Sequence, residues 1–143
     1  MEENQMEIKD AFGAANNIKF VSYDEENKNA VYKMELDEHH LNPLGVVHGA
    51  AIFGLIDTAA GYLAHYGLKK PSVTLSATTN YIKGSQARLI YSNTRVIQDT
   101  NMITVVEVSV LDGYTDELLA SSVVTMYRLK NFEDKKRDYG SKN

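Results

Sequence analysis

Residues 41–68, LNPLGVVHGAAIFGLIDTAAGYLAHYGL, decide the fold of this chain. Apolar residues recur at helical spacing from Gly49 to Ala64 and cover most of the helix circumference, which is typical of a buried helix. Its length and its internal glycines distinguish it from a membrane span. Asp57 is the one formally charged side chain of the stretch. Burying an unpaired carboxylate is costly, so Asp57 is the first candidate for a functional residue.

The composition indicates a single soluble, globular domain. The chain has 143 residues, enough for a sizeable core, and its 43% hydrophobic content is ordinary for this class. A net charge of −4 without a basic cluster in the body argues against a nucleic-acid partner. The lack of cysteine excludes disulfides and thiolate chemistry. The polar, acidic residues 1–10 do not resemble a signal peptide. We therefore expect a cytoplasmic protein without membrane contact.

The pattern around the helix predicts three segments. Residues 1–17 form a helical lead-in, residues 18–129 form the folded domain, and residues 130–143 form a charged tail that we expect to be disordered. Strands are predicted at about residues 18–23, 30–36, 72–82, 88–98, 102–112 and 118–129. One long buried helix and about six strands indicate the α+β class, with an antiparallel sheet curled around the helix.

The predicted strand at residues 72–82 indicates how the chain assembles. In a regular alternation Val73, Leu75 and Ala77 share one face, while Thr74 and Ser76 lie on the other. High β propensity and a hydroxyl-rich face favour pairing of this strand with its copy in a second chain, which hides a sheet edge. We expect a homodimer, with a dimer of dimers as the larger alternative.

Two segments resemble the signature of hotdog-fold acyl-CoA thioesterases of the phenylacetate-pathway (PaaI-like) and human-THEM type. In HHLNPLGVVHGAAIFGLIDTAAG, an Asn, a Gly, a His-Gly pair and a helical Asp follow the family's spacing, at Asn42, Gly45, His48, Gly49 and Asp57. VTLSATTNYIKG resembles the central strand, whose Ser or Thr faces the site, and Thr74 matches that position. The resemblance covers roughly residues 12–130. Ala50 departs from it, because a second glycine is frequent there.

The resemblance implies hydrolysis of an aryl or short- or medium-chain acyl-CoA to the free acid and CoA. Asp57 would be the general base to a water, or the direct nucleophile, and Thr74 would hold the water. Asn42 and the Gly49 N–H would polarise the thioester carbonyl, and His48 would support the loop or the leaving thiolate. In the family the site is shared across a dimer. One subunit would supply Asn42, His48 and Gly49, and the other would supply Asp57 and Thr74.

The chemistry explains the position of Gly49. Its N–H starts the helix, so it has no partner within the helix, and the helix dipole adds partial positive charge there. A fixed donor of this kind stabilises the oxyanion that forms in thioester hydrolysis. Asp57 follows two turns later, about 12 Å along the axis. That separation is large for one active site within a single chain.

Other candidate contacts are less specific. Lys83 and Arg88 are candidates for binding the CoA phosphates, although each would also suit a solvated surface, and Lys83-Gly84 stands where the family often has Arg-Pro. No cofactor is expected, because CoA is part of the substrate. The four histidines fit no familiar metal-ligand spacing, so no metal site is expected: His39, His40, His48 and His65.

Structural roles compete with the functional ones. Gly45 and Gly49 would also serve as turn and helix-start glycines, Asn42 as a turn former and His48 as a helix cap. A structural Asp57 would be a carboxylate bonded to backbone amides. Three classes of function follow: an acyl-CoA thioesterase, which the motif favours, a non-catalytic acyl-CoA-binding or regulatory hotdog domain, and a hotdog dehydratase or hydratase.

Overall fold

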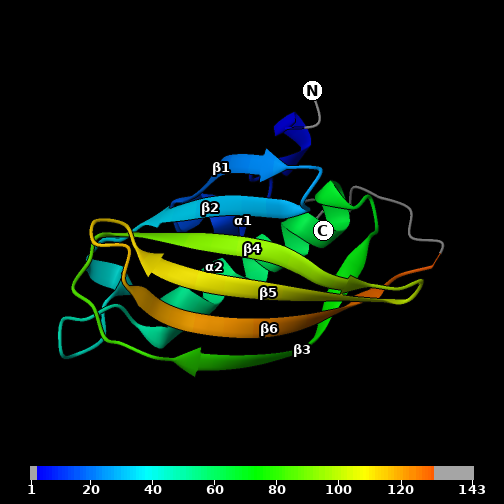
Figure 1. Cartoon of the computed structure of the whole chain (residues 1–143). Helices are drawn as coiled ribbons and strands as arrows, with labels where there is room; N and C mark the ends of the chain where they lie inside the picture. The colour runs from blue at the N-terminus through cyan, green and yellow to red at the C-terminus, as the bar shows by residue number, and fades with distance from the viewer. Residues whose placement is uncertain (1–2, 131–143) are drawn as a thin grey trace, which may run out of the picture.

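The computed structural model describes residues 3–130, and in this part of the chain one antiparallel sheet wraps one long helix (Figure 1). The predicted tail lies outside the described residues, apart from residue 130. The strands are β1 (Ile18–Asp24), β2 (Asn29–Glu35), β3 (Ser72–Tyr81), β4 (Leu89–Asp99), β5 (Ile103–Asp112) and β6 (Leu118–Arg128). Their order is β1-β2-β4-β5-β6-β3, and every neighbouring pair is antiparallel. This confirms the predicted α+β hotdog architecture.

The long helix α2 (Gly49–Tyr62) lies across the concave face of the sheet. Its apolar side chains enter one core with the inward-facing residues of the strands, among them Leu55, Ile56, Tyr32 and Val108, none of which is exposed to solvent. Each large aliphatic side chain buried in this way contributes about 2 kcal/mol of hydrophobic stabilisation. The chain then continues as a single π-helical turn, η3 (Leu63–Gly67). The sheet-facing side of α2 therefore anchors the domain.

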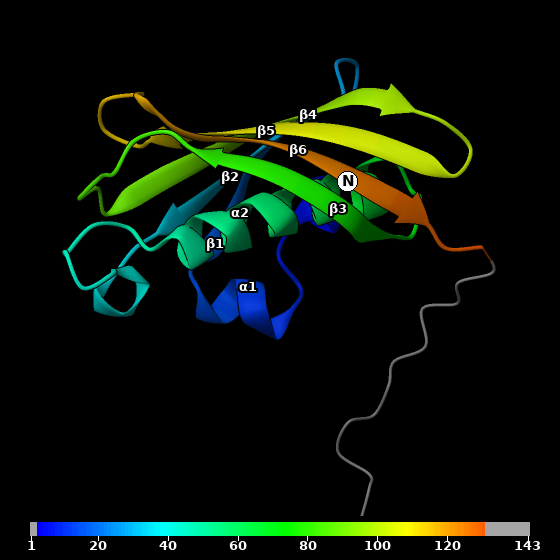
Figure 2. The same ribbon diagram turned by 90° about the horizontal axis from the view of Figure 1, so that it is seen from below.

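The N-terminal segment packs against the other side of α2. It comprises the 3-10 turn η1 (Glu3–Met6) and the short helix α1 (Ala11–Ala15). Figure 2 shows α2 between the sheet and α1. Met6 is buried in the core, and the Tyr32 hydroxyl donates a 2.6 Å hydrogen bond to its carbonyl oxygen. Another 3-10 turn, η2 (Glu38–His40), precedes the loop that leads into α2.

Strand β3 forms one edge of the sheet and departs from regular alternation. Its pairing with β6 shifts between Thr74 and Ser76, so Leu75 sits in a β-bulge. Thr74 is paired with the buried Met126 and Ala77 with the buried Val124, which places both on the helix-facing side. The predicted alternation is wrong here, because the extra residue shifts the side-chain sequence by one position.

Candidate active site

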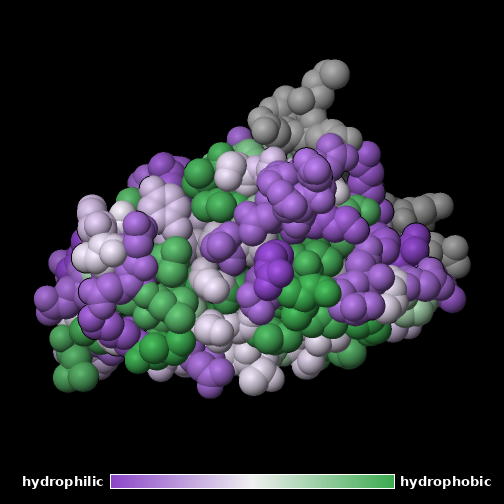
Figure 3. All heavy atoms as spheres, in the orientation of Figure 1, coloured by the Kyte–Doolittle hydropathy of each residue, from purple (hydrophilic) through white to green (hydrophobic). Residues whose placement is uncertain are grey.

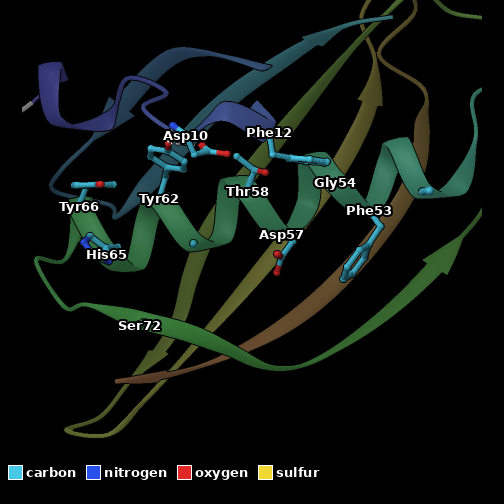
Figure 4. Close-up of a pocket in the computed structure, with 12 residues that line it drawn as sticks. Asp10, Phe12, Phe53, Gly54, Asp57, Thr58, Tyr62, His65, Tyr66 and Ser72 are labelled. Carbon is cyan, nitrogen blue, oxygen red and sulfur yellow. Dashed lines mark hydrogen bonds between the residues drawn. The ribbon is translucent and has the colours of Figure 1, made fainter. Parts of the chain in front are cut away.

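A groove of about 650 Å³ runs along the flank of α2 that the sheet does not cover (Figure 4). In Figure 4, Asp57 and Phe53 point toward β3, whereas Asp10, Phe12 and Tyr62 lie on the opposite side of the helix. The lining residues are Asp10, Phe12, Ala50, Phe53, Gly54, Asp57, Thr58, Gly61, Tyr62, His65, Tyr66 and Ser72. A cavity of this volume and mixed lining suits a small-molecule ligand.

Asp57 is half-buried on this flank, not sealed inside the core as its apolar neighbours predicted. The difference arises because the outer flank of α2 faces the groove. Thr74 donates a 2.6 Å hydrogen bond from its hydroxyl to Asp57 Oδ1, and the same hydroxyl lies 3.4 Å from Met126 Sδ. The β3 bulge thus turns Thr74 toward the carboxylate. The sequence matched both residues to one half of a site, and the structure brings them into direct contact.

The first turn of α2 supplies the second group of candidates. His48 is the N-cap, and its Nδ1 accepts a 2.9 Å hydrogen bond from the Ala50 N–H. In the described part of the chain the Gly49 N–H has no hydrogen-bond partner. The ring of Tyr81, at the end of β3, lies 3.5 Å from the point where a Gly49 Cβ would stand. The helix therefore begins with an unpaired donor beside an aromatic ring.

Asn42 organises the loop before this turn. Its Oδ1 accepts hydrogen bonds from the Leu44 and Val46 N–H groups, at 2.9 and 3.2 Å. Gly45 has a φ of +78°, a conformation that glycine adopts without strain. Asn42 thus has the turn-forming role that its type favours, with its carbonyl oxygen occupied by the backbone and its amide group left as the possible donor.

One chain does not bring the two groups of candidates together. Gly49 and Asp57 lie two turns apart on the same helix, about 12 Å along its axis. Asp57 pairs with Thr74 beside the open edge of β3, whereas Asn42, His48 and Gly49 lie at the N-terminal end of α2.

The candidates for phosphate binding lie outside the groove. Lys83 is exposed and forms an ion pair with Glu117. Arg88 is also exposed, and its guanidinium donates a 2.9 Å hydrogen bond to the Gln86 carbonyl oxygen. Neither residue contributes to the groove wall.

The groove contains residues that the motif did not single out. Tyr62 donates a 2.6 Å hydrogen bond to Asp10 Oδ1, and its oxygen accepts from the Lys9 and Asp10 N–H groups. Burial, followed by the bond to Asp10, raises the pKa of Tyr62 to about 12, so it stays a neutral donor. Phe12 lies in α1, within the helical lead-in predicted at residues 1–17, but the sequence does not indicate where that helix docks.

One histidine cluster has a structural role. Asp37 and His40 form a capping box around η2: the Asp37 N–H donates to His40 Nδ1 at 3.1 Å. The other ring nitrogen of His40 lies 3.0 Å from Asn16 Oδ1. Both nitrogens of this buried ring are therefore occupied. Separately, none of the helices in residues 3–130 has the length and apolarity needed to cross a membrane.

Solved structures share this fold across nearly their whole length. The conserved protein PA5202 from Pseudomonas aeruginosa is 29% identical, with a TM-score of 0.77 over 88% of this chain and 98% of that one. PaaI from the phenylacetic acid degradation operon of E. coli is 21% identical, with a TM-score of 0.78 over 85% and 86%. Streptococcus mutans smu.793, bound to acetyl CoA, is 24% identical, with a TM-score of 0.74 over 85% and 93%. No curated protein sequence matches the chain.

These likenesses define a hotdog-fold protein of PaaI-like architecture, as the sequence motif predicted. The family model of the thioesterase superfamily matches residues 44–118. This range begins in the loop two residues after Asn42 and includes all of α2 and β3. The chain belongs to the thioesterase superfamily and is a thioester hydrolase.

Proposed function

We propose that this thioesterase hydrolyses acyl-CoA, with Asp57 as the general base. The observation that carries the proposal is the 2.6 Å hydrogen bond from Thr74 to Asp57 Oδ1 at the wall of the groove. The bond fixes one carboxylate oxygen and leaves Oδ2 to accept a proton from water. That water attacks the thioester carbonyl carbon and Asp57 takes its proton; the C–S bond of the tetrahedral intermediate then breaks, and the proton on Asp57 passes to the leaving thiolate, which gives the acid and CoA and restores the carboxylate.

The proposed oxyanion donor is the Gly49 N–H of a second copy. In one chain Gly49 lies about 12 Å from Asp57, so a complete site needs another helix N-terminus brought beside the carboxylate. Pairing of two β3 edges would juxtapose the α2 helices on one side of a continuous sheet. Asn42 of the second copy would add its amide group, and His48 would hold the turn that aims the N–H.

Exposed apolar residues support the homodimer. Val73 and Leu75 on the open edge strand are 48% and 63% exposed in the single chain. Val123, Tyr127 and Ile97 are also exposed, and Figure 3 shows apolar patches among hydrophilic side chains on the outer face of the sheet. That face is the surface through which we expect two dimers to form a tetramer.

Coenzyme A as the carrier is supported by two neighbours in the same fold. The S. mutans protein was solved with acetyl CoA, and a hypothetical thioesterase from Streptococcus pneumoniae with coenzyme A. Lys83 and Arg88 stay as candidates for the phosphates, although Lys83 would have to leave Glu117. If KM is insensitive to salt and to Lys83→Ala and Arg88→Ala, these two residues do not bind the phosphates.

The test measures the release of free thiol from a panel of aryl, short-chain and medium-chain acyl-CoA thioesters. We expect turnover of at least one of these classes, and a turnover lower by about 100-fold or more in Asp57→Asn. If the wild type releases no thiol from any acyl-CoA but cleaves the same acyl groups from acyl-carrier protein, the proposed carrier is wrong.

A further inference from the structure

The position of Phe12 relative to α2 carries an inference that rests on the proposed function and extends it. We propose that Phe12 determines which acyl groups the enzyme accepts, because its ring bounds the part of the groove that holds the acyl group. Phe12 lies in α1, outside residues 44–118 that match the family model. It is therefore a feature of this chain beyond the part that the family model describes.

The contact between Phe12 and Gly54 narrows the groove. A Cβ on Gly54 would stand 3.0 Å from Phe12 Cζ and 3.3 Å from Cε1, so the ring lies directly over the helix backbone where a side chain is missing. Phe53, the preceding residue of α2, forms the opposite wall (Figure 4). An acyl group that lies over Gly54 would thus pass between two aromatic rings.

The distribution of polar side chains along the groove indicates toward which end of α2 the acyl group extends from Asp57. Toward the start of α2 from Asp57, the lining residues are Gly54, Phe53, Phe12 and Ala50, and none has a polar side chain. Toward the end of α2, the lining includes Asp10, Tyr62, His65, Tyr66 and Ser72. An apolar acyl group gains free energy from burial only at the first end, so we place it there.

Hydrogen bonds at both ends of α1 hold Phe12 in place. At the N-cap, Asp10 accepts from the Gly13 N–H at 2.8 Å and from Tyr62 at 2.6 Å. At the C-cap, Asn16 Oδ1 lies 3.0 Å from His40 Nε2. Phe12 itself is 54% exposed in the single chain, so about half of its surface is open for a ligand in the groove to cover.

The experiment compares Phe12→Ala with Tyr114→Ala, which removes a 70% exposed aromatic ring outside the groove lining. The readout is kcat/KM for acetyl-, butyryl-, hexanoyl-, octanoyl- and decanoyl-CoA. In Phe12→Ala, short chains lose the ring contact and long chains gain room. If the space that the ring vacates takes about two further methylenes of the longer chain, the ratio of octanoyl to butyryl activity should rise about 16-fold, since each buried methylene is worth about fourfold. Tyr114→Ala should keep the wild-type ratio.

Two glycine variants test toward which end of α2 the acyl group extends. Gly54→Ala adds a methyl group against Phe12, whereas Gly61→Ala adds the same group on the same helix where nothing lies within 4 Å. We expect the chain-length ratio to change in Gly54→Ala. A change in Gly61→Ala alone, with none in Gly54→Ala or Phe12→Ala, would place the acyl group at the other end and overturn the inference.

The outcomes separate this inference from the proposed function. If the wild type hydrolyses acyl-CoAs and Phe12→Ala keeps its chain-length ratio, the function stands and the role of Phe12 is wrong. If no acyl-CoA is hydrolysed, the proposed function fails. In that case calorimetry measures the affinities of octanoyl- and butyryl-CoA for Asp57→Asn and for the double variant that also carries Phe12→Ala. A different ratio of the two affinities in the double variant supports the role of Phe12. An unchanged ratio, or no binding, overturns it.

Discussion

The Thr74 hydroxyl donates a 2.6 Å hydrogen bond to Oδ1 of Asp57, although the two residues lie on different elements, the edge strand β3 and the outer flank of α2. The contact depends on the bulge at Leu75, which turns Thr74 toward the helix. From this contact we propose that Thr74 orients the carboxylate, as a positioning residue for the proposed base. Its predicted role of holding the water stays a prediction.

Replacement of Thr74 tests this role. Thr74→Ala removes the bond, and we expect kcat to fall about tenfold, the scale of one hydrogen bond to a charged group. Thr74→Ser keeps the hydroxyl and should restore most of the activity. Steady-state kinetics of both variants measure the effect. Equal losses in the two would mean that the methyl group, and not the hydroxyl, matters.

The sequence predicted the parts of the fold that depend on local patterning. Helical periodicity gave α2, and β-branched runs gave six strands, because each element buries a regular face. The bulge at Leu75 was missed because an inserted residue leaves no mark in such an alternation. Phe53 and Tyr62 were expected to line the acyl site, and both line the groove. Phe12 was missed because its position depends on where α1 docks: its contact with Gly54 joins residues 42 positions apart and has no periodic signal.

The Gly49 N–H can be removed with little disturbance to the helix. Gly49 is the first helical residue, a position where proline is favoured, and His48 is extended with ψ of 137°, as a residue before proline should be. Gly49→Pro should therefore stay folded and lose about 100-fold or more in kcat, the scale of a missing oxyanion donor. Gly49→Ala keeps the N–H and is the matched control. Similar kinetics for the two variants would exclude the N–H as oxyanion donor.

The edge-strand dimer predicts sensitivity of β3 to charge. Lysine in place of Val73 and Leu75 together should give a species with the mass of one chain and no turnover, because charged residues on an edge oppose strand pairing. Val21→Lys is the control, since Val21 is 44% exposed on β1, the opposite edge. Light scattering and activity measure the result. If the double lysine variant or the Val21→Lys control is a monomer and still turns over substrate, the site is not shared between two chains.

His40 makes stability depend on pH. Burial, followed by the nearby His39, lowers the pKa of His40 below the ordinary value of 6.5, while Asp37 opposes the shift. The unfolded chain then binds this proton more readily than the folded one, so the stability is complete above pH 6.5 and declines as the pH falls.

Melting temperatures between about pH 7.5 and about pH 5.5 measure this dependence. They should fall in the wild type and fall less in His40→Asn, whose amide oxygen can still accept from the Asp37 N–H. If the melting temperature falls by the same amount in both proteins, groups other than His40 account for the pH dependence.

Sharing of the site between two copies can be tested by mixing inactive variants. Asp57→Asn and Gly49→Pro each leave one half of the proposed site intact. Random exchange of equal amounts makes about half of the dimers mixed, and each mixed dimer has one intact site of its two. About a quarter of the wild-type activity should return. No recovery, with exchange verified by mass, would mean that Asp57 and Gly49 act within one chain.

Asp57→Asn tests the central claim most directly. The variant keeps the size and polarity of the side chain but removes the base. Turnover of the best acyl-CoA should fall by about 100-fold or more, with a much smaller change in KM and no loss of melting temperature. If the melting temperature falls and the loss of folded protein equals the loss of turnover, the Asp57 carboxylate has a structural role. Turnover within about twofold of the wild type would contradict the assignment of Asp57 as the general base.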